Sequence, residues 1–120
     1  MNEDLLHYIW KYQRFSSPIA TTDNKAIKVE NPGRINTDAG PDFTNAKVRI
    51  DNTLWAGNIE IHLNASDWYV HRHHQDEAYG NIILHVVYHD DKPVMDRNGN
   101  KVPTLELKNH IDQQLLSGYK

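Results

Sequence analysis

Residues 59–63 read Ile-Glu-Ile-His-Leu, and the rest of the chain is interpreted around this stretch. Side chains along a β-strand alternate between its two faces, so Ile59, Ile61 and Leu63 share one face. The glutamate and the histidine share the other face. The pattern predicts a strand of a half-buried sheet, with a carboxylate and an imidazole side by side on its polar face.

A second acidic residue stands at the start of the preceding predicted strand, in Gly40-Pro41-Asp42-Phe43. If Asp42 lies beside Glu60 and His62, the three side chains could hold a hard cation, because such cations prefer oxygen ligands. A cation of this kind activates water and polarises phosphate. The alternative is that all three are ordinary polar residues on a half-exposed sheet.

The composition is typical of one folded domain. The chain has 120 residues, of which 38% are hydrophobic and 24% charged, and this length supports a small core. The absence of cysteine excludes disulfides, thiolate metal sites and a cysteine nucleophile. The net charge of −3 argues against a protein that binds duplex through a basic surface, although eight histidines can add positive charge.

The start of the chain lacks a secretory signal, and no apolar run is long enough to span a membrane. We therefore expect a cytoplasmic protein with no membrane partner. The predicted domain covers residues 1–120. It would be the N-terminal part of a longer protein, because the last helical pattern stops abruptly.

Hydrophobic periodicity predicts a mixed α/β fold in the order α-β-β-β-α-β-β-β-α. The turn Arg97-Asn98-Gly99-Asn100 predicts a hairpin late in the chain. A nearly continuous apolar run predicts a strand that is buried on both faces. The expected helices are 3–15, 68–79 and a segment from 108 onward, and the expected strands are 26–30, 43–51, 54–64, 81–89, 94–96 and 101–107.

Asp42 and Glu60-Ile61-His62, on consecutive predicted strands before a helix and a buried strand, resemble the PD-(D/E)XK nuclease superfamily. The resemblance implies a restriction-endonuclease-like fold, a mixed β-sheet flanked by helices. It also implies Mg²⁺ or Mn²⁺ held by Asp42, Glu60 and the main-chain carbonyl of Ile61. His62 replaces the lysine of that superfamily, where it could act as a general base, select another metal or mark an inactive site.

Gln75 and Tyr79 have the Gln-x-x-x-Tyr spacing of an exonuclease branch of that superfamily. The resemblance implies that they position the substrate strand or the attacking water, from one face of the predicted helix. That branch often has a metal-binding histidine in an earlier helix, which by analogy is His7. Lys47 and Arg49 could contact phosphates, although two basic residues do not form a patch.

Three segments resemble the N-terminal part of a family of uncharacterised bacterial proteins. They are Gly-Pro-Asp-Phe at 40–43, Gly-Asn-Ile-Glu-Ile-His at 57–62 and Leu-His-Val-Val-Tyr at 84–88. This second resemblance covers most of the chain, and it implies no activity.

The histidines offer an alternative metal site. His71 and His74 are three positions apart on the predicted helix, so with His62 or His85 they could bind Zn²⁺. They could equally be solvated imidazoles, and His85 is predicted to be a hydrogen-bonded core histidine. The three tryptophans are predicted to be core or interface anchors rather than base-stacking platforms: Trp10, Trp55 and Trp68.

Three functions therefore remain open. The first is a metal-dependent phosphodiesterase that acts on nucleic acid, and it requires the Asp42 and Glu60 carboxylates to lie within about 5 Å. The second is a non-catalytic module on the same fold that binds nucleic acid or protein. The third is a histidine-rich Zn²⁺-binding domain. A second copy of the chain, as a homo-oligomer, could be needed for any of them.

Overall fold

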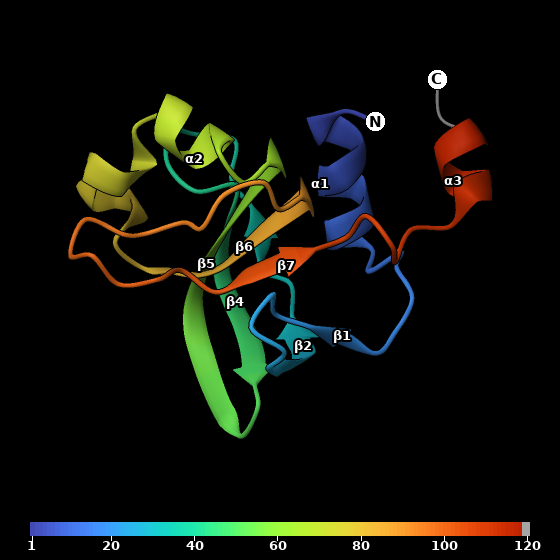
Figure 1. Cartoon of the computed structure of the whole chain (residues 1–120), viewed down its shortest axis with the longest axis horizontal. Helices are drawn as coiled ribbons and strands as arrows, with labels where there is room; N and C mark the ends of the chain where they lie inside the picture. Colours follow the sequence, from blue (N-terminus) through green and yellow to red (C-terminus); the bar gives the residue numbers. More distant parts are fainter. Residues whose placement is uncertain (119–120) are drawn as a thin grey trace.

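A strongly curved mixed β-sheet forms the centre of the computed structural model, which describes residues 1–118 (Figure 1). Seven strands belong to the sheet in this part of the chain, in the order β1-β2-β4-β5-β6-β7, with β3 paired to β4. The helices and strands are α1 (Glu3–Lys11), β1 (Ile19–Ala20), β2 (Ala26–Asn31), β3 (Arg34–Ile35), β4 (Phe43–Ile50), β5 (Thr53–Asn64), α2 (Asp67–Val70), the 3₁₀ turns η1 (His73–Gln75) and η2 (Glu77–Tyr79), β6 (Ile82–His89), β7 (Thr104–Glu106) and α3 (Gln113–Gly118).

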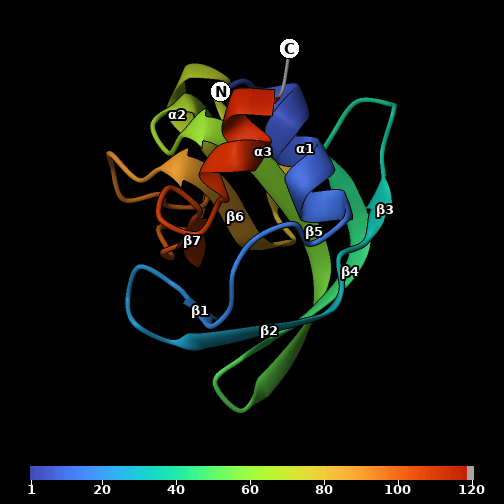
Figure 2. The same cartoon turned by 90° about the vertical axis from the view of Figure 1, so that its right-hand side faces the viewer.

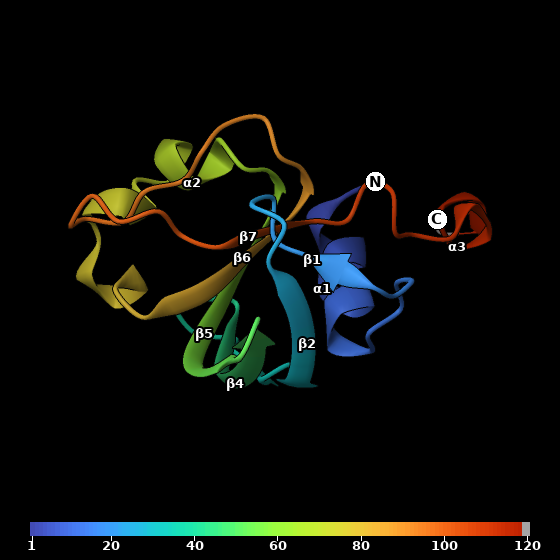
Figure 3. The ribbon, with the colours of Figure 1, turned by 60° about the horizontal axis from the view of Figure 1, so that its bottom comes forward.

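The strands change direction at the middle of the sheet. The pairs from β1 through β5 are antiparallel, whereas β5 pairs with β6, and β6 with β7, in parallel. In Figure 3 the strands β2, β4, β5 and β6 follow one another around an arc, and Figure 2 shows α1 against the curved sheet. The predicted mixed α/β class is confirmed.

Helix α1 covers one face of the sheet and ends earlier than predicted. Its N-terminus is capped as expected, because the Asn2 side chain accepts a hydrogen bond of 2.9 Å from the Leu5 amide. Gln13 has a φ of 53°, which prevents continuation of the helix toward residue 15. The buried face of the helix consists of Leu5, Leu6, Ile9 and Trp10.

A second, smaller core lies under α2. Trp68 is fully buried there with Val87, and its indole N–H donates to the Met95 carbonyl at 3.0 Å. The prediction of core tryptophans is correct for Trp10 and Trp68. Trp55 is not a core residue, because it is 50% exposed near the tip of the β4–β5 hairpin, on the same face as its strand partner Val48; its role as an interface anchor stays a prediction.

The predicted helix over 68–79 is wrong. The chain forms the short α2 and then the two 3₁₀ turns, because Arg72 takes a left-handed conformation with φ 57° and Asp76 is extended. Tertiary contacts of the turn residues outweigh the helical pattern. In particular, the His73 side chain bonds to Glu60 and its ring stacks on Tyr79.

The predicted hairpin between residues 94 and 107 forms only close to its turn. The Asp96 side chain accepts from the Asn98 and Asn100 amides and closes the turn. The flanks pair antiparallel at the Met95–Lys101 bridge, and the Val102 amide donates to the Val94 carbonyl at 2.8 Å. Pro103 has no N–H for a ladder, so β7 begins after it, at the edge of the sheet and parallel to β6. None of the helices within residues 1–118 has both the length and the apolar character needed to cross a membrane.

Gly57 allows β5 to pass close to the start of β6. A Cβ at this position would lie 2.5 Å from the Ile83 side chain and 2.8 Å from the Asn81 carbonyl oxygen. Gly57→Ala is expected to destabilise the fold by about 1–3 kcal/mol, because the neighbouring backbone has to shift. Urea denaturation would measure this, with Ala56→Ser on the exposed side of the same strand as a control. Equal stability of the two variants would contradict the expectation.

Candidate metal centre

Asp42 and Glu60 hold each other in place through the backbone. The Asp42 amide donates to Glu60 Oε1 at 3.1 Å, and the Ile61 amide donates to Asp42 Oδ2 at 2.8 Å. The two carboxyl groups lie close enough for Asp42 to raise the pKa of Glu60. The acids predicted from the sequence are therefore in contact, as a shared cation requires.

This mutual hold exists because the ladder between β4 and β5 stops at the pair Phe43–Ile59. A bulge follows within β4, where Asn45 has a φ of 59°. Beyond the last pair, the Asp42 and Ile61 amides have no strand carbonyl opposite them in this ladder. The carboxylates of Glu60 and Asp42 accept their hydrogen bonds instead. Ile61 thus contributes an N–H to the site, and in a strand the carbonyl of the same residue faces the same side.

His7 approaches the acids from α1. Its Nε2 lies 3.7 Å from Asp42 Oδ1, which is too long for a hydrogen bond. The atom is buried and has no hydrogen-bond partner among the described residues. A cation between these two atoms would satisfy both, which fits the ligand role implied for His7. Figure 1 shows the N-terminal half of α1 at the same end of the sheet as α2.

His62 projects from β5 on the same face as Glu60. Its Nε2 lies 3.5 Å from Glu60 Oε2, and its Nδ1 lies 2.8 Å from Nε2 of His85 on β6. His85 is fully buried, as predicted for a core histidine, and its partner is another imidazole rather than a carbonyl or an acid. The contact fixes the orientation of the His62 ring.

His73 is the site residue that sequence reasoning missed. Its Nε2 lies 2.6 Å from Glu60 Oε2, and its ring stacks on Tyr79 with centroids 3.8 Å apart. Only the density of histidines over 71–74 pointed to this segment. The i, i+3 rule selected His71 and His74, but the helix on which that rule depends is not formed.

Burial dominates the electrostatics of the cluster. Desolvation, together with the nearby Asp42, raises the pKa of Glu60 far above its usual value. Desolvation lowers the pKa of His62 to about 2 and that of His73 to about 4. Both shifts oppose an ion pair at the short contact between Glu60 and His73 and favour a hydrogen bond between neutral groups.

Two further groups at the cluster show the same effect. Desolvation and the neighbouring His73 lower the pKa of His85 to about 3. Desolvation and the nearby Glu60 raise the pKa of Tyr79 to about 12, so its phenol stays protonated at neutral pH. The imidazoles of His62, His73 and His85 are neutral at neutral pH and keep one lone pair each, which is the form that binds metals.

Acid is expected to destabilise the metal-free protein. His62, His73 and His85 have folded pKa values below the unfolded value of about 6.5, so the unfolded state binds more protons as the pH falls. Their stability contribution is full above that pH and falls by about 1.4 kcal/mol per histidine per pH unit below it. The raised pKa of Glu60 has the opposite effect on the free energy of unfolding, and it offsets the contribution of one of the three histidines.

Urea denaturation in chelator between about pH 7 and pH 5 would measure this dependence. The free energy of unfolding should decrease on acidification over that range. Stability that stays level or rises as the pH falls would contradict the buried, neutral state of the three imidazoles.

Several predicted residues lie outside the cluster. Gln75 is exposed on η1, and only Tyr79 of the Gln-x-x-x-Tyr pair reaches the site. Lys47 and Arg49 lie toward the hairpin end of β4, about 15 Å or more along the strand from Asp42. Arg49 is 3.6 Å from the Glu30 carboxylate.

The zinc set built on His62, His71, His74 and His85 is not assembled as predicted. The His74 ring packs against Tyr69 with centroids 5.0 Å apart. The exposed His71 stacks on His62 and His73 at centroid distances of 5.4 Å and 5.5 Å. His73 takes the place that the prediction gave to His74.

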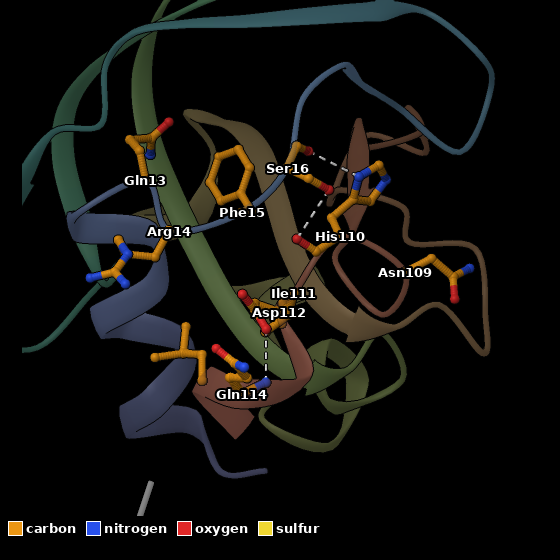
Figure 4. A pocket seen from close by; sticks show the side chains of 10 residues that line it. Gln13, Arg14, Phe15, Ser16, Asn109, His110, Ile111, Asp112 and Gln114 are labelled. Carbon is orange, nitrogen blue, oxygen red and sulfur yellow. Dashed lines mark hydrogen bonds between the residues drawn. The ribbon is translucent and has the colours of Figure 1, made fainter. Parts of the chain in front are cut away.

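A cavity of about 750 Å³ lies away from these residues (Figure 4). It separates the end of α1 from the segment that leads into α3. Figure 4 shows Arg14 and Phe15 on one side and His110 and Asp112 on the other. It contains none of the predicted site residues. The candidate metal ligands therefore lie in the enclosed polar cluster and not in this open hollow.

The family of this chain follows from comparison with known proteins. No curated protein and no solved structure matched the chain. The segments that resemble uncharacterised bacterial proteins are those that carry Asp42, Glu60 and His85. Residues 3–120 match the model of the family described as protein of unknown function (DUF2851), and the chain belongs to that family.

Proposed function

We propose that this protein is a metal-dependent phosphodiesterase that acts on nucleic acid. The observation that carries the proposal is the meeting of the Asp42 and Glu60 carboxyl groups beside the unpartnered His7 Nε2. Two acids from adjacent strands and an imidazole from a preceding helix are the ligand set of the exonuclease branch that the sequence resembles.

The arrangement of the elements supports a restriction-endonuclease-like fold for this activity. The antiparallel strands β2, β4 and β5 come first, a helical segment follows, and the buried β6 then pairs in parallel with β5. Asp42 directly precedes β4 and Glu60 lies on β5, the consecutive strands that the resemblance requires. The departure is the helical segment, which consists of α2 and two 3₁₀ turns instead of one helix.

Asp42, Glu60, the Ile61 carbonyl and His7 would hold the cation. Three oxygen ligands suit Mg²⁺, whereas the imidazole of His7 favours Mn²⁺. When bound, the cation supplies charge for the phosphate oxygens and an activated water. The protein's own part is to fix both carboxylates through the Asp42 and Ile61 amides before the substrate arrives.

His62 stands where the superfamily has its lysine. Because it is neutral and held by His85, its Nε2 keeps a fixed position beside Glu60. Its pKa of about 2 makes it too weak a base to take a proton from water at neutral pH, so its part would be to accept a hydrogen bond that orients the water. The protonated Tyr79 phenol, on the ring stacked over His73, could donate to a phosphate oxygen. Lys47 and Arg49 would contact the substrate backbone farther along β4.

The test is cleavage of single- and double-stranded DNA and RNA in the presence of Mn²⁺ or Mg²⁺. Asp42→Asn should abolish it, whereas Asp38→Asn, an exposed acid in the same loop, should leave it unchanged. Activity that survives in Asp42→Asn would point to a contaminant and refute the proposal. Salt-sensitive retention of nucleic acid without cleavage would favour the non-catalytic module instead.

A further inference from the structure

We propose that Glu60, His62 and His73 form a second metal site, which binds a nitrogen-preferring divalent cation such as Zn²⁺. The inference deepens the proposed function, because the second site shares Glu60 with the first. Its other ligands are different, so the two proposals can fail independently.

The three ligand atoms converge on one point. Glu60 Oε2 lies 2.6 Å from His73 Nε2 and 3.5 Å from His62 Nε2, and the three residues offer ligand atoms within 4.8 Å of one another. Ligands at tetrahedral zinc lie about 3.3 Å apart, given metal–ligand distances near 2.0–2.1 Å. A small rotation of the His73 ring therefore converts the metal-free contacts into a coordination sphere.

A hydrogen-bonded core accounts for only part of this arrangement. Glu60 Oε2 already has His73 as a partner at 2.6 Å, yet His62 Nε2 is directed at the same oxygen at 3.5 Å, which is beyond a good hydrogen bond. Two imidazoles aimed at one carboxylate oxygen have the spacing of ligands around a common cation. A cation between them would satisfy all three atoms.

The neighbours of the two imidazoles fix their orientation. His62 Nδ1 lies 2.8 Å from His85 Nε2, so when the Nδ1 proton is donated to His85 the Nε2 lone pair faces Glu60. Metal-binding histidines are commonly held in this way by a partner on the far ring nitrogen. His73 is held instead by the Tyr79 ring and by the edge of Trp68, at a centroid distance of 5.4 Å.

The ligand set also selects the cation. Two imidazoles and one carboxylate are the protein ligands of many catalytic zinc sites, which leave one position for water or substrate. The cluster is enclosed, with Glu60 and His62 each only 3% exposed, so the cation would lie in a largely dry environment. Mg²⁺ is disfavoured at this site because it prefers oxygen ligands and retains its waters.

Glu60 is placed to join the two sites. Its Oε1 faces the Asp42 amide and its Oε2 faces the two histidines, so each oxygen could serve a different cation. Two cations that share a carboxylate can stabilise the attacking and the leaving oxygens of a phosphodiester separately. In this arrangement His62 is a ligand, which explains why it replaces a lysine.

The site is tested by calorimetric titration of the chelator-treated protein with Zn²⁺. The absorption spectrum of the Co²⁺-substituted protein reports the coordination geometry. His73→Ala should weaken Zn²⁺ binding by more than about 100-fold, the most that loss of an outer-shell partner costs. His74→Ala is the matched control, because its ring packs on Tyr69, and should bind as wild type does. His62→Asn provides a second ligand variant, and metal-free melting curves show whether each variant is folded.

The outcomes separate the two proposals. Asp42→Asn should lose cleavage yet retain the histidine-dependent Zn²⁺ equivalent. If no substrate is cleaved under any condition but Zn²⁺ binding depends on His73 and His62, the proposed function fails and the second site stands. If wild type and folded His73→Ala bind Zn²⁺ equally, or neither binds it, the second site is refuted even where Asp42-dependent cleavage is found.

Discussion

Replacement of Glu60 by glutamine is expected to abolish metal binding and cleavage while it makes the metal-free protein more stable. Glutamine has the same shape and can still accept from the Asp42 amide, but it provides no anionic oxygen for a cation. The buried glutamate has a raised pKa, so the folded state binds a proton that the unfolded state releases. The contribution of Glu60 to wild-type stability therefore falls as the pH rises above about 4.5, and the glutamine variant escapes this loss.

The gap between the two proteins should widen by about 1.4 kcal/mol per pH unit until Glu60 ionises in the folded state. Urea denaturation in chelator at several pH values would measure it. Glu77→Gln removes the same charge from an exposed position and should change stability by less than about 0.5 kcal/mol. A Glu60→Gln protein that is less stable than wild type at alkaline pH would contradict the burial argument.

Replacement of Trp68 by alanine is expected to cost about 3–5 kcal/mol of stability. The indole is fully buried, fills the smaller core and donates to the Met95 carbonyl. Its loss leaves a cavity and removes the ring against which His73 and His85 pack, with centroids 5.4 Å and 5.3 Å away. The variant should therefore lose metal affinity as well as stability.

Chemical denaturation and metal titration would measure the two effects. Trp55→Ala removes the same side chain from a half-exposed site on the hairpin, where the cost should be well below that at Trp68. Similar losses at the two positions would show that the core under α2 contributes little to the fold. An unchanged metal affinity in a folded Trp68→Ala protein would show that His73 is held by other contacts.

The parts of the fold that follow from local pattern could be predicted. The alternation in β5, the apolar run of β6 and the Asn2 cap of α1 all depend on residues close in sequence. The contact between Asp42 and Glu60 could be predicted from the sequence, because consecutive antiparallel strands bring such positions together. The class of the fold and the location of the acidic site follow from these features.

The parts that depend on distant contacts could not be predicted. The segment around Arg72 has a helical pattern, but its backbone follows the bond between His73 and Glu60 and the stack on Tyr79. The left-handed backbone conformation of Arg72 brings His73 rather than His74 to Glu60. Arginine seldom adopts this conformation, so its presence in the sequence does not predict it. The two-residue strands β1 and β3 carry too little sequence to show a period.

The mutual hold of Asp42 and Glu60 gives the protein two built-in reporters. The amide protons of Asp42 and Ile61 are bound to the same carboxylates that would contact a cation, in place of strand partners. Their exchange with solvent therefore depends on how often the hydrogen bonds between the start of β4 and the end of β5 open. The chemical shifts and exchange rates of these two amides would therefore report occupancy of the metal centre directly.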